Sequence, residues 1–278
     1  MILVVESGAT KCDWCLCERG GEPVKYKTSG INVAVMDEDA ISSIVGGFAS
    51  GLERTVRDSV EAVHFYGAGL VGGKESEGLL TALVSFFPQV KVDFASDLIA
   101  AARALFGDEP GVAAIMGTGS NSCMYDGEKV IGNYRAGGFI LGDEGSGAVL
   151  GKLFLSDYFK GLVPEPVAGE FDREFGLDYI TAVQNVYKGQ APSRYLASFA
   201  PFIVSHRENP YVEALLRRNF RDFIERSLSR YECKKVGVVG TFGAVCQDMI
   251  AQIGEEYGLE FVGFLASPLE RLVEYHLA

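Results

Sequence analysis

The sequence predicts an α/β protein made of two related halves, each a mixed sheet flanked by helices. Three observations support this fold class. The chain has 278 residues, which is long for a single small core. A strand, a glycine-containing turn and a second strand occur around Gly8 and again around Gly117. After each copy come a third short strand and then strands that alternate with amphipathic helices.

The first half begins with a hairpin and continues with strand–helix–strand units. A short turn between two apolar segments favours antiparallel pairing, whereas strands separated by helices favour parallel pairing, so the sheet is expected to be mixed. The segments that alternate or stay apolar predict strands near 2–6, 12–18, 23–28, 62–67 and 90–95. The segments with helical periodicity predict helices near 38–56, 75–86 and 97–106.

The second half repeats this order with a longer helical region inside it. Strands are expected near 112–116, 121–126, 129–134, 235–240 and 259–264, and helices across 143–230, after Gly243, and from Ser267 to Leu277. We therefore predict one domain over 1–106 and a second over 107–266 with a helical insertion. The final helix, 267–278, is expected to pack back on the first domain.

The charge of the chain argues against nucleic acid as a partner. The net charge is −12, so an average surface would repel a polyanion. The densest basic cluster is interleaved with acidic residues at helical spacing, which is typical of a solvated face with salt bridges. Its members are Arg217, Arg218, Arg221, Arg226 and Arg230, beside Glu213, Asp222 and Glu225. The first residues reach Glu6 too soon for a signal peptide or a membrane span, so we expect a cytoplasmic protein without a membrane partner.

Six cysteines are present, and three of them lie close together in the sequence. In an alternating strand Cys15 and Cys17 share one face and Cys12 lies on the other, whereas a tetrahedral metal site needs ligands that converge. No histidine is near them in the sequence. Reduced structural cysteines of a cytoplasmic protein are therefore favoured over a metal cluster.

The two glycine turns are candidate anion sites. Consecutive backbone N–H groups in such a turn form a concavity that binds phosphate, and hydroxyls from Thr10, Thr118, Ser120 and Ser122 can donate without adding bulk. Lys11 adds positive charge. The alternative is that each turn only closes a hairpin. Two turns in the same setting favour phosphate more than one turn would.

Five segments along most of the chain carry a family resemblance: ESGATKCDW, SDLIAAARALFG, MGTGSNS, GGFILGDEGSG and VGVVGTFGAV. In this order they resemble the first phosphate loop, the interdomain helix that opens with a catalytic aspartate, the second phosphate loop, the sugar-side segment and the adenosine motif of one family. That family is the N-acetylglucosamine kinase group of the BadF/BadG/BcrA/BcrD ATPases, in the actin/Hsp70/hexokinase superfamily. Glu6, Ser7 and Ala9 stand where the superfamily usually has aspartate and glycines, and Thr241 stands where a second glycine or serine is usual.

The resemblance implies two ribonuclease H-like (actin-like ATPase) domains with an interdomain cleft. It also implies ATP- and Mg²⁺-dependent phosphorylation of an amino sugar, with N-acetylglucosamine and its 6-hydroxyl as the first expectation. Kinases for glucosamine or N-acetylmuramic acid stay open, as does an activator ATPase of the same family. The activator needs cysteines for an iron–sulfur cluster shared by two subunits, and Cys123 is the only one near the start of the second domain. A silent sugar sensor is a further alternative, which an intact Asp97 disfavours. A small-molecule sugar is the expected partner, and a homodimer is compatible with the sequence.

Asp97 is the expected catalytic base. It follows an apolar strand and precedes an alanine-rich helix, where α/β folds gather their ligands. The alternative role is a helix cap, which Ser96 or Asp97 could supply. The resemblance favours catalysis.

The resemblance also assigns the sugar and nucleotide ligands. Expected sugar ligands are Asn32, Asp97, Thr118, Asn121, Gly138 and Asp143, although Asn32 could be a turn residue and Asp143 a helix cap. Expected phosphate and ATP ligands are Ser7, Gly8, Ala9, Thr10, Lys11, Gly117, Thr118, Gly119, Ser120, Gly240, Thr241 and Gly243. Glu6 is expected to contact Mg²⁺ through water, with Glu144 as the alternative.

Overall fold

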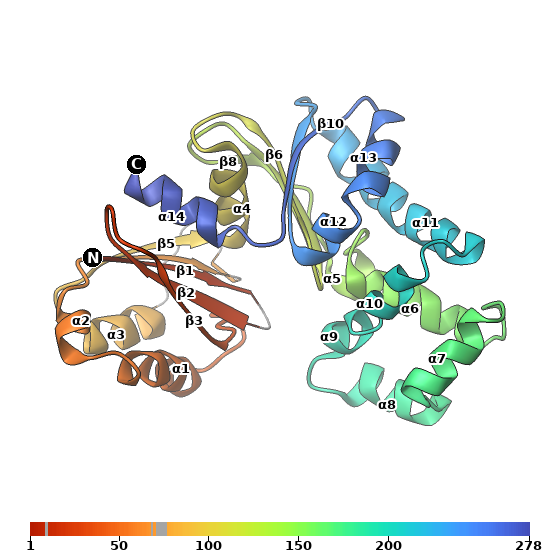
Figure 1. Ribbon diagram of the computed structural model, residues 1–278, viewed down its shortest axis with the longest axis horizontal. Helices are drawn as coiled ribbons and strands as arrows, with labels where there is room; N and C mark the ends of the chain where they lie inside the picture. The colour runs from red at the N-terminus through yellow and green to blue at the C-terminus, as the bar shows by residue number, and fades with distance from the viewer. Residues whose placement is uncertain (9–10, 68, 71–76) are drawn as a thin grey trace. The chain divides into compact units, whose positions relative to one another are not determined.

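The computed structural model describes residues 1–8, 11–67, 69–70 and 77–278. Within these residues the chain forms two compact units, Met1–Asp108 with Pro268–Ala278, and Glu109–Ser267. Each unit contains a five-stranded mixed sheet with helices packed against it (Figure 1). The predicted fold class, two α/β halves with mixed sheets, is confirmed.

The sheet of the first unit has the strand order β3-β2-β1-β4-β5. β1 pairs antiparallel with β2 and parallel with β4, so the buried run Leu3–Val5 lies at the centre of the sheet. β3 is an edge strand and most of its side chains are exposed. The strands are β1 (Ile2–Ser7), β2 (Lys11–Cys17), β3 (Val24–Ser29), β4 (Ala62–Gly67) and β5 (Lys91–Ser96).

Different helices cover the two faces of this sheet (Figure 1). Leu3 and Val5 pack with α1 and α3, whereas α4 and α14 lie on the other face, toward which Glu6 points because side chains alternate along a strand. The C-terminal helix α14 contacts α4, β1 and β2. The helices are α1 (Glu38–Ser50), α2 (Arg54–Asp58), α3 (Glu77–Phe86), α4 (Asp97–Phe106) and α14 (Leu269–Leu277).

One helix prediction in this unit was too long. The segment 38–56 forms two helices, because α1 ends where the Gly51 N–H bonds back to Phe48 O at 3.1 Å, and α2 begins only after Glu53. Buried Leu52 lies in the break. Of the helix predicted over 75–86, residues 75–76 lie outside the described residues and the rest is α3.

The second unit has the strand order β10-β9-β6-β7-β8, which repeats the connectivity of the first. β6 pairs antiparallel with β7 and parallel with β9, as β1 does with β2 and β4. Val112, Ala114 and Met116 of β6 face a core made largely by α6, α11 and α13. The strands are β6 (Gly111–Met116), β7 (Ser120–Tyr125), β8 (Val130–Gly132), β9 (Lys235–Val239) and β10 (Glu260–Leu265).

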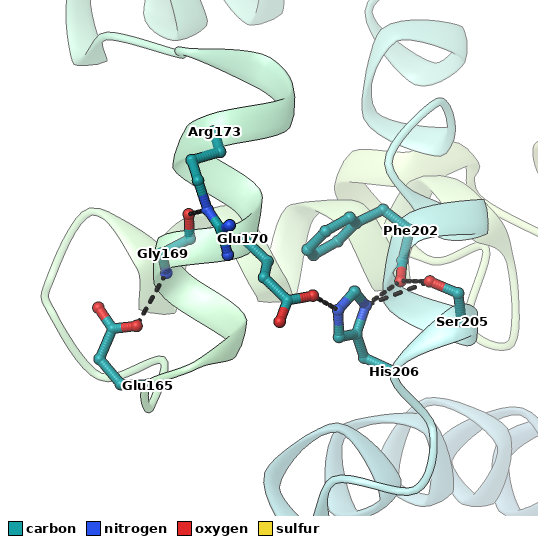
Figure 2. Close-up of polar contacts among 7 residues, drawn as sticks. All are labelled: Glu165, Gly169, Glu170, Arg173, Phe202, Ser205 and His206. Carbon is teal, nitrogen blue, oxygen red and sulfur yellow. Dashed lines mark hydrogen bonds and ion pairs between the residues drawn. The ribbon is translucent and has the colours of Figure 1, made fainter.

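A helical insertion separates β8 from β9. Its helices are joined by side-chain contacts such as the one in Figure 2, where Glu170 of α7 lies 2.8 Å from His206 Nε2 and the His206 ring also contacts Phe202 O at 2.8 Å. The insertion begins earlier than predicted, with a single turn at Gly138. Its helices are α5 (Gly138–Leu141), α6 (Gly147–Tyr158), α7 (Val167–Phe175), α8 (Tyr179–Lys188), α9 (Pro192–Ala197), α10 (Ala200–Ser205), α11 (Pro210–Arg226) and the 3₁₀ turn η1 (Leu228–Arg230).

Two helices follow β9, and the first begins before Gly243. Gly240 precedes α12 (Thr241–Val245), and α13 (Gln247–Glu255) continues after Cys246. None of the helices in the described part of the chain is long and apolar enough to cross a membrane. All six cysteines are free thiols, and five of them are buried.

Candidate active site

The carboxyl ends of the parallel strands in the first unit gather acidic side chains. Ser7, Gly67 and Ser96 are in register across β1, β4 and β5, so Asp97 begins one residue beyond the edge at which β1 ends. Glu6 lies opposite Asp13 in the β1–β2 hairpin, and the two side chains share a face. This edge therefore brings Glu6, Asp13 and Asp97 into one electrostatic neighbourhood.

Glu6 has an unusual pKa because of this neighbourhood. The pKa of the Glu6 carboxyl is raised to about 7: burial is the largest cause, the Lys11 ammonium opposes it, and the Asp13 and Asp97 carboxylates add to it. Lys11 Nζ lies 2.7 Å from Asp13 Oδ2, and the Asp13 side chain is almost fully buried. Lys11 thus faces two acids, Glu6 and Asp13.

Asp97 is the first residue of α4 but does not cap it. The cap is Ser96, whose hydroxyl accepts from the Ile99 N–H at 3.3 Å. Asp97 Oδ1 accepts from the Leu98 N–H at 2.9 Å. Burial raises the pKa of the Asp97 carboxyl, and the Leu98 N–H opposes the shift. The second carboxylate oxygen of Asp97 can accept a proton from another group.

The first phosphate turn is described only in part. The Gly8 N–H donates to Lys11 O at 3.0 Å, so it closes the turn itself. The Ser7 side chain is fully buried and bonds to the backbone of Ile31. Predicted ligands Ala9 and Thr10 lie outside the described residues.

Asn32 follows Ile31 and begins a turn. Its backbone carbonyl accepts from the N–H groups of Val35 and Met36, and its Oδ1 accepts from Ala34 N at 3.0 Å. Asn32 is thus a turn residue, the alternative role that the sequence left open. The NH₂ group of the amide remains the donor that this side chain can offer to a hydroxyl.

The second phosphate turn is anchored to the start of α6. The N–H groups of Gly147 and Ala148 donate to Gly117 O and Thr118 O at 2.9 and 3.1 Å. The Gly117 N–H donates to Gly119 O within the turn. A side chain at Gly117 would meet open space, so a ligand can approach the backbone there.

The adenosine-motif glycines pack against this turn. A Cβ on Gly240 would lie 2.3 Å from Met116 O, and the residue has φ +127°, so both space and backbone conformation require glycine. A Cβ on Gly243 would lie 3.0 Å from the Cβ of Met116. Thr241 is exposed at the first position of α12. The structure therefore brings Gly117, Gly240 and Gly243 together.

Asp143 is held in a strained position over the same turn. It has φ +54°, a region that non-glycine residues rarely adopt and that recurs at functional sites. Its Oδ2 lies 3.0 Å from where a Cβ of Gly119 would be. Burial raises the pKa of the Asp143 carboxyl, while the Ser120 backbone N–H opposes this. The cap of α6 is Ser146, so Asp143 does not cap that helix.

The segment around Asp143 is fixed from several directions. Ser120 Oγ donates to Glu144 O at 2.6 Å, and the Asp143 N–H donates to Ala136 O at 2.9 Å. Glu144, the alternative magnesium contact, pairs through Oε1 with Arg226 Nη1 at 2.8 Å. Its carboxylate is thus already neutralised by a cation.

The remaining predicted sugar ligands differ in how far they are engaged. Asn121 Oδ1 accepts from the Ser122 N–H at 2.9 Å and from Asn133 Nδ2 at 3.0 Å. Gly138 is exposed in α5, with φ +72° and open space where a side chain would lie. Asn121 therefore keeps its NH₂ group for a ligand, and Gly138 offers backbone only.

Two residues that contact the candidate site residues or their loops were not predicted from the sequence. Asp13 is a buried acid whose signal was its position opposite Glu6 in the hairpin. Asn219 is fully buried on α11, where its Oδ1 accepts from Gly145 N and its Nδ2 donates to Ser146 O, both at 3.1 Å. Its signal was a polar residue on the apolar stripe formed with Leu215.

Comparison with known proteins gives structural matches. No protein-family model matches the sequence. No curated protein matches it. A solved structure described as a putative N-acetylglucosamine kinase from Porphyromonas gingivalis is 38% identical, with a TM-score of 0.90, and the alignment covers 100% of this chain and 99% of that one.

Two more distant solved structures share the fold. A protein described as a putative N-acetylglucosamine kinase from Chromobacterium violaceum is 20% identical, with a TM-score of 0.69 and coverage of 99% of this chain and 98% of its own. The ROK hexokinase from Thermus thermophilus is 14% identical, with a TM-score of 0.55 and coverage of 98% of both chains. At these identities the likeness concerns the two-domain fold alone.

Proposed function

The chain belongs to the N-acetylglucosamine kinase-like family of actin-like sugar kinases, and from this premise we propose that it phosphorylates the 6-hydroxyl of N-acetylglucosamine with ATP in the cytoplasm. The observation that carries the proposal is Asp97. It is a carboxylate of raised pKa at the carboxyl edge of the parallel strands, and Ser96 performs the capping role that would otherwise explain it.

In the proposed reaction Asp97 accepts the proton of the sugar hydroxyl. The hydroxyl oxygen forms a bond to the γ-phosphorus of ATP, the bond from that phosphorus to the ADP oxygen breaks, and the proton passes to the Asp97 carboxylate. The Leu98 N–H holds one oxygen of this carboxylate and so orients the other. A base with a raised pKa binds the proton more firmly than an ordinary aspartate does.

The sugar is proposed to be held by Asn32 and Asp143, with Thr118, Asn121 and Gly138 beside it. A carboxylate accepts from two neighbouring hydroxyls, and an amide both donates and accepts. The strained backbone of Asp143 supports a binding role, since several hydrogen bonds around it maintain that conformation. These residues would orient the hydroxyl for transfer.

The phosphates are proposed to contact the turns at Gly8–Lys11 and Gly117–Ser120, with the adenosine near Gly240, Thr241 and Gly243. Mg²⁺ fits the edge at Glu6. Among the described residues no group of three acidic, histidine or cysteine side chains could hold a metal alone, but Mg²⁺ usually takes one or two carboxylates with waters and substrate phosphates. Burial raises the pKa of Glu6 although Lys11 opposes the shift, so a further cation beside this carboxylate would stabilise its charged form. The ion would supply that charge to Glu6 and to the phosphates.

A panel of sugars tests the proposal. N-acetylglucosamine, glucosamine, N-acetylmuramic acid, N-acetylmannosamine and glucose are each assayed with Mg²⁺ and ATP by coupled detection of ADP. The proposal expects kcat/KM to be highest for N-acetylglucosamine. A higher value for another amino sugar would replace the substrate but keep the reaction. ADP formation that no sugar stimulates would favour the activator ATPase.

A further inference from the structure

The hydroxyl of Ser7 holds one residue of the following loop by both of its backbone groups. Ser7 Oγ accepts from the Ile31 N–H at 2.7 Å and donates to Ile31 O at 3.0 Å. Both residues are fully buried. Ile31 lies beyond the end of β3, so the strand ladder does not bond its backbone. Ser7 therefore replaces the missing ladder partner.

The direction of the Ser7 side chain separates it from the charged groups of the phosphate turn. Side chains alternate along β1, so Ser7 shares the face of Val5, which packs with α1 and α3. Glu6 points to the opposite face, together with its hairpin partner Asp13 and the lysine paired with that aspartate. The hydroxyl bonds to Ile31 with both its hydrogen and a lone pair, and it also contacts the thiol of Cys12, its buried partner across the hairpin.

The residue after Ile31 is the proposed sugar ligand Asn32. Its amide oxygen is fixed by the Ala34 N–H at 3.0 Å, and Gly69 lies so close that a Cβ there would be 2.5 Å from Asn32 Oδ1. The side chain is thus fixed relative to its own backbone. The position of that backbone, in turn, is set by the two bonds from Ser7 to the preceding residue.

We propose that Ser7 is a positioning residue for the sugar and not a phosphate ligand. Its buried hydroxyl, at the end of β1, holds the backbone of Ile31 and thereby fixes the position of the next residue, Asn32. The proposal rests on the proposed kinase function, because it assigns Asn32 to the sugar. It replaces the sequence-based assignment of the Ser7 side chain to phosphate.

The test compares Ser7→Ala with a matched control, Thr28→Val. Thr28 Oγ1 accepts from the indole N–H of buried Trp14 at 2.9 Å, so the control also removes a hydroxyl partner of a buried donor in the same unit. We expect Ser7→Ala to raise the KM for N-acetylglucosamine about tenfold or more, and to change kcat and the KM for ATP by less than about twofold. Thr28→Val should leave all three near wild type, and Ser7→Thr, which keeps the hydroxyl, should restore the sugar KM.

A second readout does not depend on catalysis. Hydrogen exchange of a peptide covering residues 30–36 should be faster in Ser7→Ala than in wild type, and unchanged in Thr28→Val. If wild type phosphorylated no sugar, the proposed function would fail while this measurement still tested the clamp. Ser7→Cys, with its weaker donor, gives an intermediate shift if the alanine variant does not fold.

Three results would overturn the proposal. The first is a Ser7→Ala variant with an unchanged sugar KM. The second is a raised KM for ATP with normal sugar binding, which would make Ser7 a phosphate ligand. The third is unchanged exchange over residues 30–36, which would show that the hydroxyl does not hold the loop.

Discussion

The turn after β1 and the turn after β6 occupy the same place in two sheets of like connectivity, but different groups surround them. Beside the first lie the acids Glu6, Asp13 and Asp97 with one lysine. Beside the second lie backbone groups: the glycines of the adenosine motif and the first N–H groups of α6. One scaffold can thus place charge and proton transfer in one unit and close backbone approach in the other.

Both units also use a buried polar side chain to fix a loop. In the first unit Ser7 bonds both backbone groups of Ile31, next to Asn32. In the second unit Asn219 bonds Gly145 and Ser146, close to Asp143. The two proposed sugar ligands therefore lie on loops whose backbones are fixed by groups from the interior of their own unit, so each ligand is preorganised within that unit.

The largest expected effect is a loss of turnover on removal of an acid from the first unit. Asp97→Asn should lower turnover about 10²–10⁴-fold, because it removes the general base. The thermal melt should stay close to wild type, since Ser96 remains to cap α4. Steady-state rates at saturating ATP and sugar, measured beside the melt, check both expectations.

The control for this variant is Asp93→Asn on β5, the strand that leads into α4. The Asp93 side chain is 76% exposed and contacts His64 at 3.2 Å, away from the proposed chemistry. It should keep normal turnover. A folded Asp97→Asn protein with near-normal turnover would remove Asp97 from the mechanism and leave the acidic edge without a catalytic role.

The next effect tests the two hydrogen bonds by which Asn219 holds Gly145 and Ser146 in the second unit. Asn219→Ala leaves the Gly145 N–H and the Ser146 carbonyl without their buried partner, so the free energy of unfolding should fall by about 2–5 kcal/mol. Sugar KM should rise because Asp143 is no longer held. Urea unfolding and steady-state kinetics measure the two changes.

Asn209→Ala on the same helix is the matched variant for this clamp. It removes the α11 cap, in which Asn209 Oδ1 accepts from Tyr211 N at 3.0 Å, and should cost about 1 kcal/mol without altering sugar KM. Equal sugar KM values in the two variants would mean that Asn219 acts on stability alone.

A smaller effect concerns the pH dependence of the acidic unit. Because the Glu6 pKa is raised from 4.5 to about 7, the folded state holds a proton that the unfolded state releases between these values. The Glu6 contribution to stability is therefore full below pH 4.5 and is lost as pH rises toward 7, by up to about 3 kcal/mol. For Glu6→Gln, the free energy of unfolding should vary less with pH over this window.

The single tryptophan, Trp14, is buried in this unit and reports its unfolding by fluorescence. Parallel profiles for the two proteins would contradict the assignment.

The smallest effect lies in the helical insertion of the other unit. Burial lowers the pKa of His206, but its hydrogen bonds to Phe202 O and Glu170 together outweigh burial and leave the pKa raised; the hydrogen bond to His206 lowers the pKa of Glu170 (Figure 2). The histidine contribution is lost as pH rises through its raised pKa, and the glutamate contribution is lost as pH falls through its lowered pKa. Glu170→Gln should thus lower the melting temperature slightly near pH 5.5 and not at pH 9, whereas exposed Glu208→Gln should have no effect at either pH. A loss of equal size at both pH values would show that charge pairing is not its cause.

Local sequence patterns predicted most strands, but contacts between segments far apart in the sequence became known only from the structure. The apolar run at 62–67 predicted β4 with its observed bounds, because a buried parallel strand is continuous in apolar residues. The break at Gly51 was missed because the apolar periodicity continues across it. The packing of Gly240 on Met116 joins segments far apart in sequence, so no local pattern could predict it.

The candidate site shows the same division. The position of Asp97 between a strand and a helix was predictable from local pattern, whereas its catalytic role comes from the family resemblance and stays a prediction. The partner of Ser7 was not, because the Ile31 loop is 24 residues away and its path depends on the core beneath it. Asn219 could have been found from helical periodicity alone, as a polar residue among apolar ones on α11.

The most direct test of the central claim is the fate of the transferred phosphoryl group. The protein is incubated with N-acetylglucosamine, Mg²⁺ and ATP, and the products are analysed by ³¹P–¹H correlation NMR together with assays for ADP and inorganic phosphate. We predict one phosphosugar for each ADP, with the phosphorus coupled to the two protons on carbon 6 of the sugar. ADP matched by inorganic phosphate, with no phosphosugar, would contradict the account.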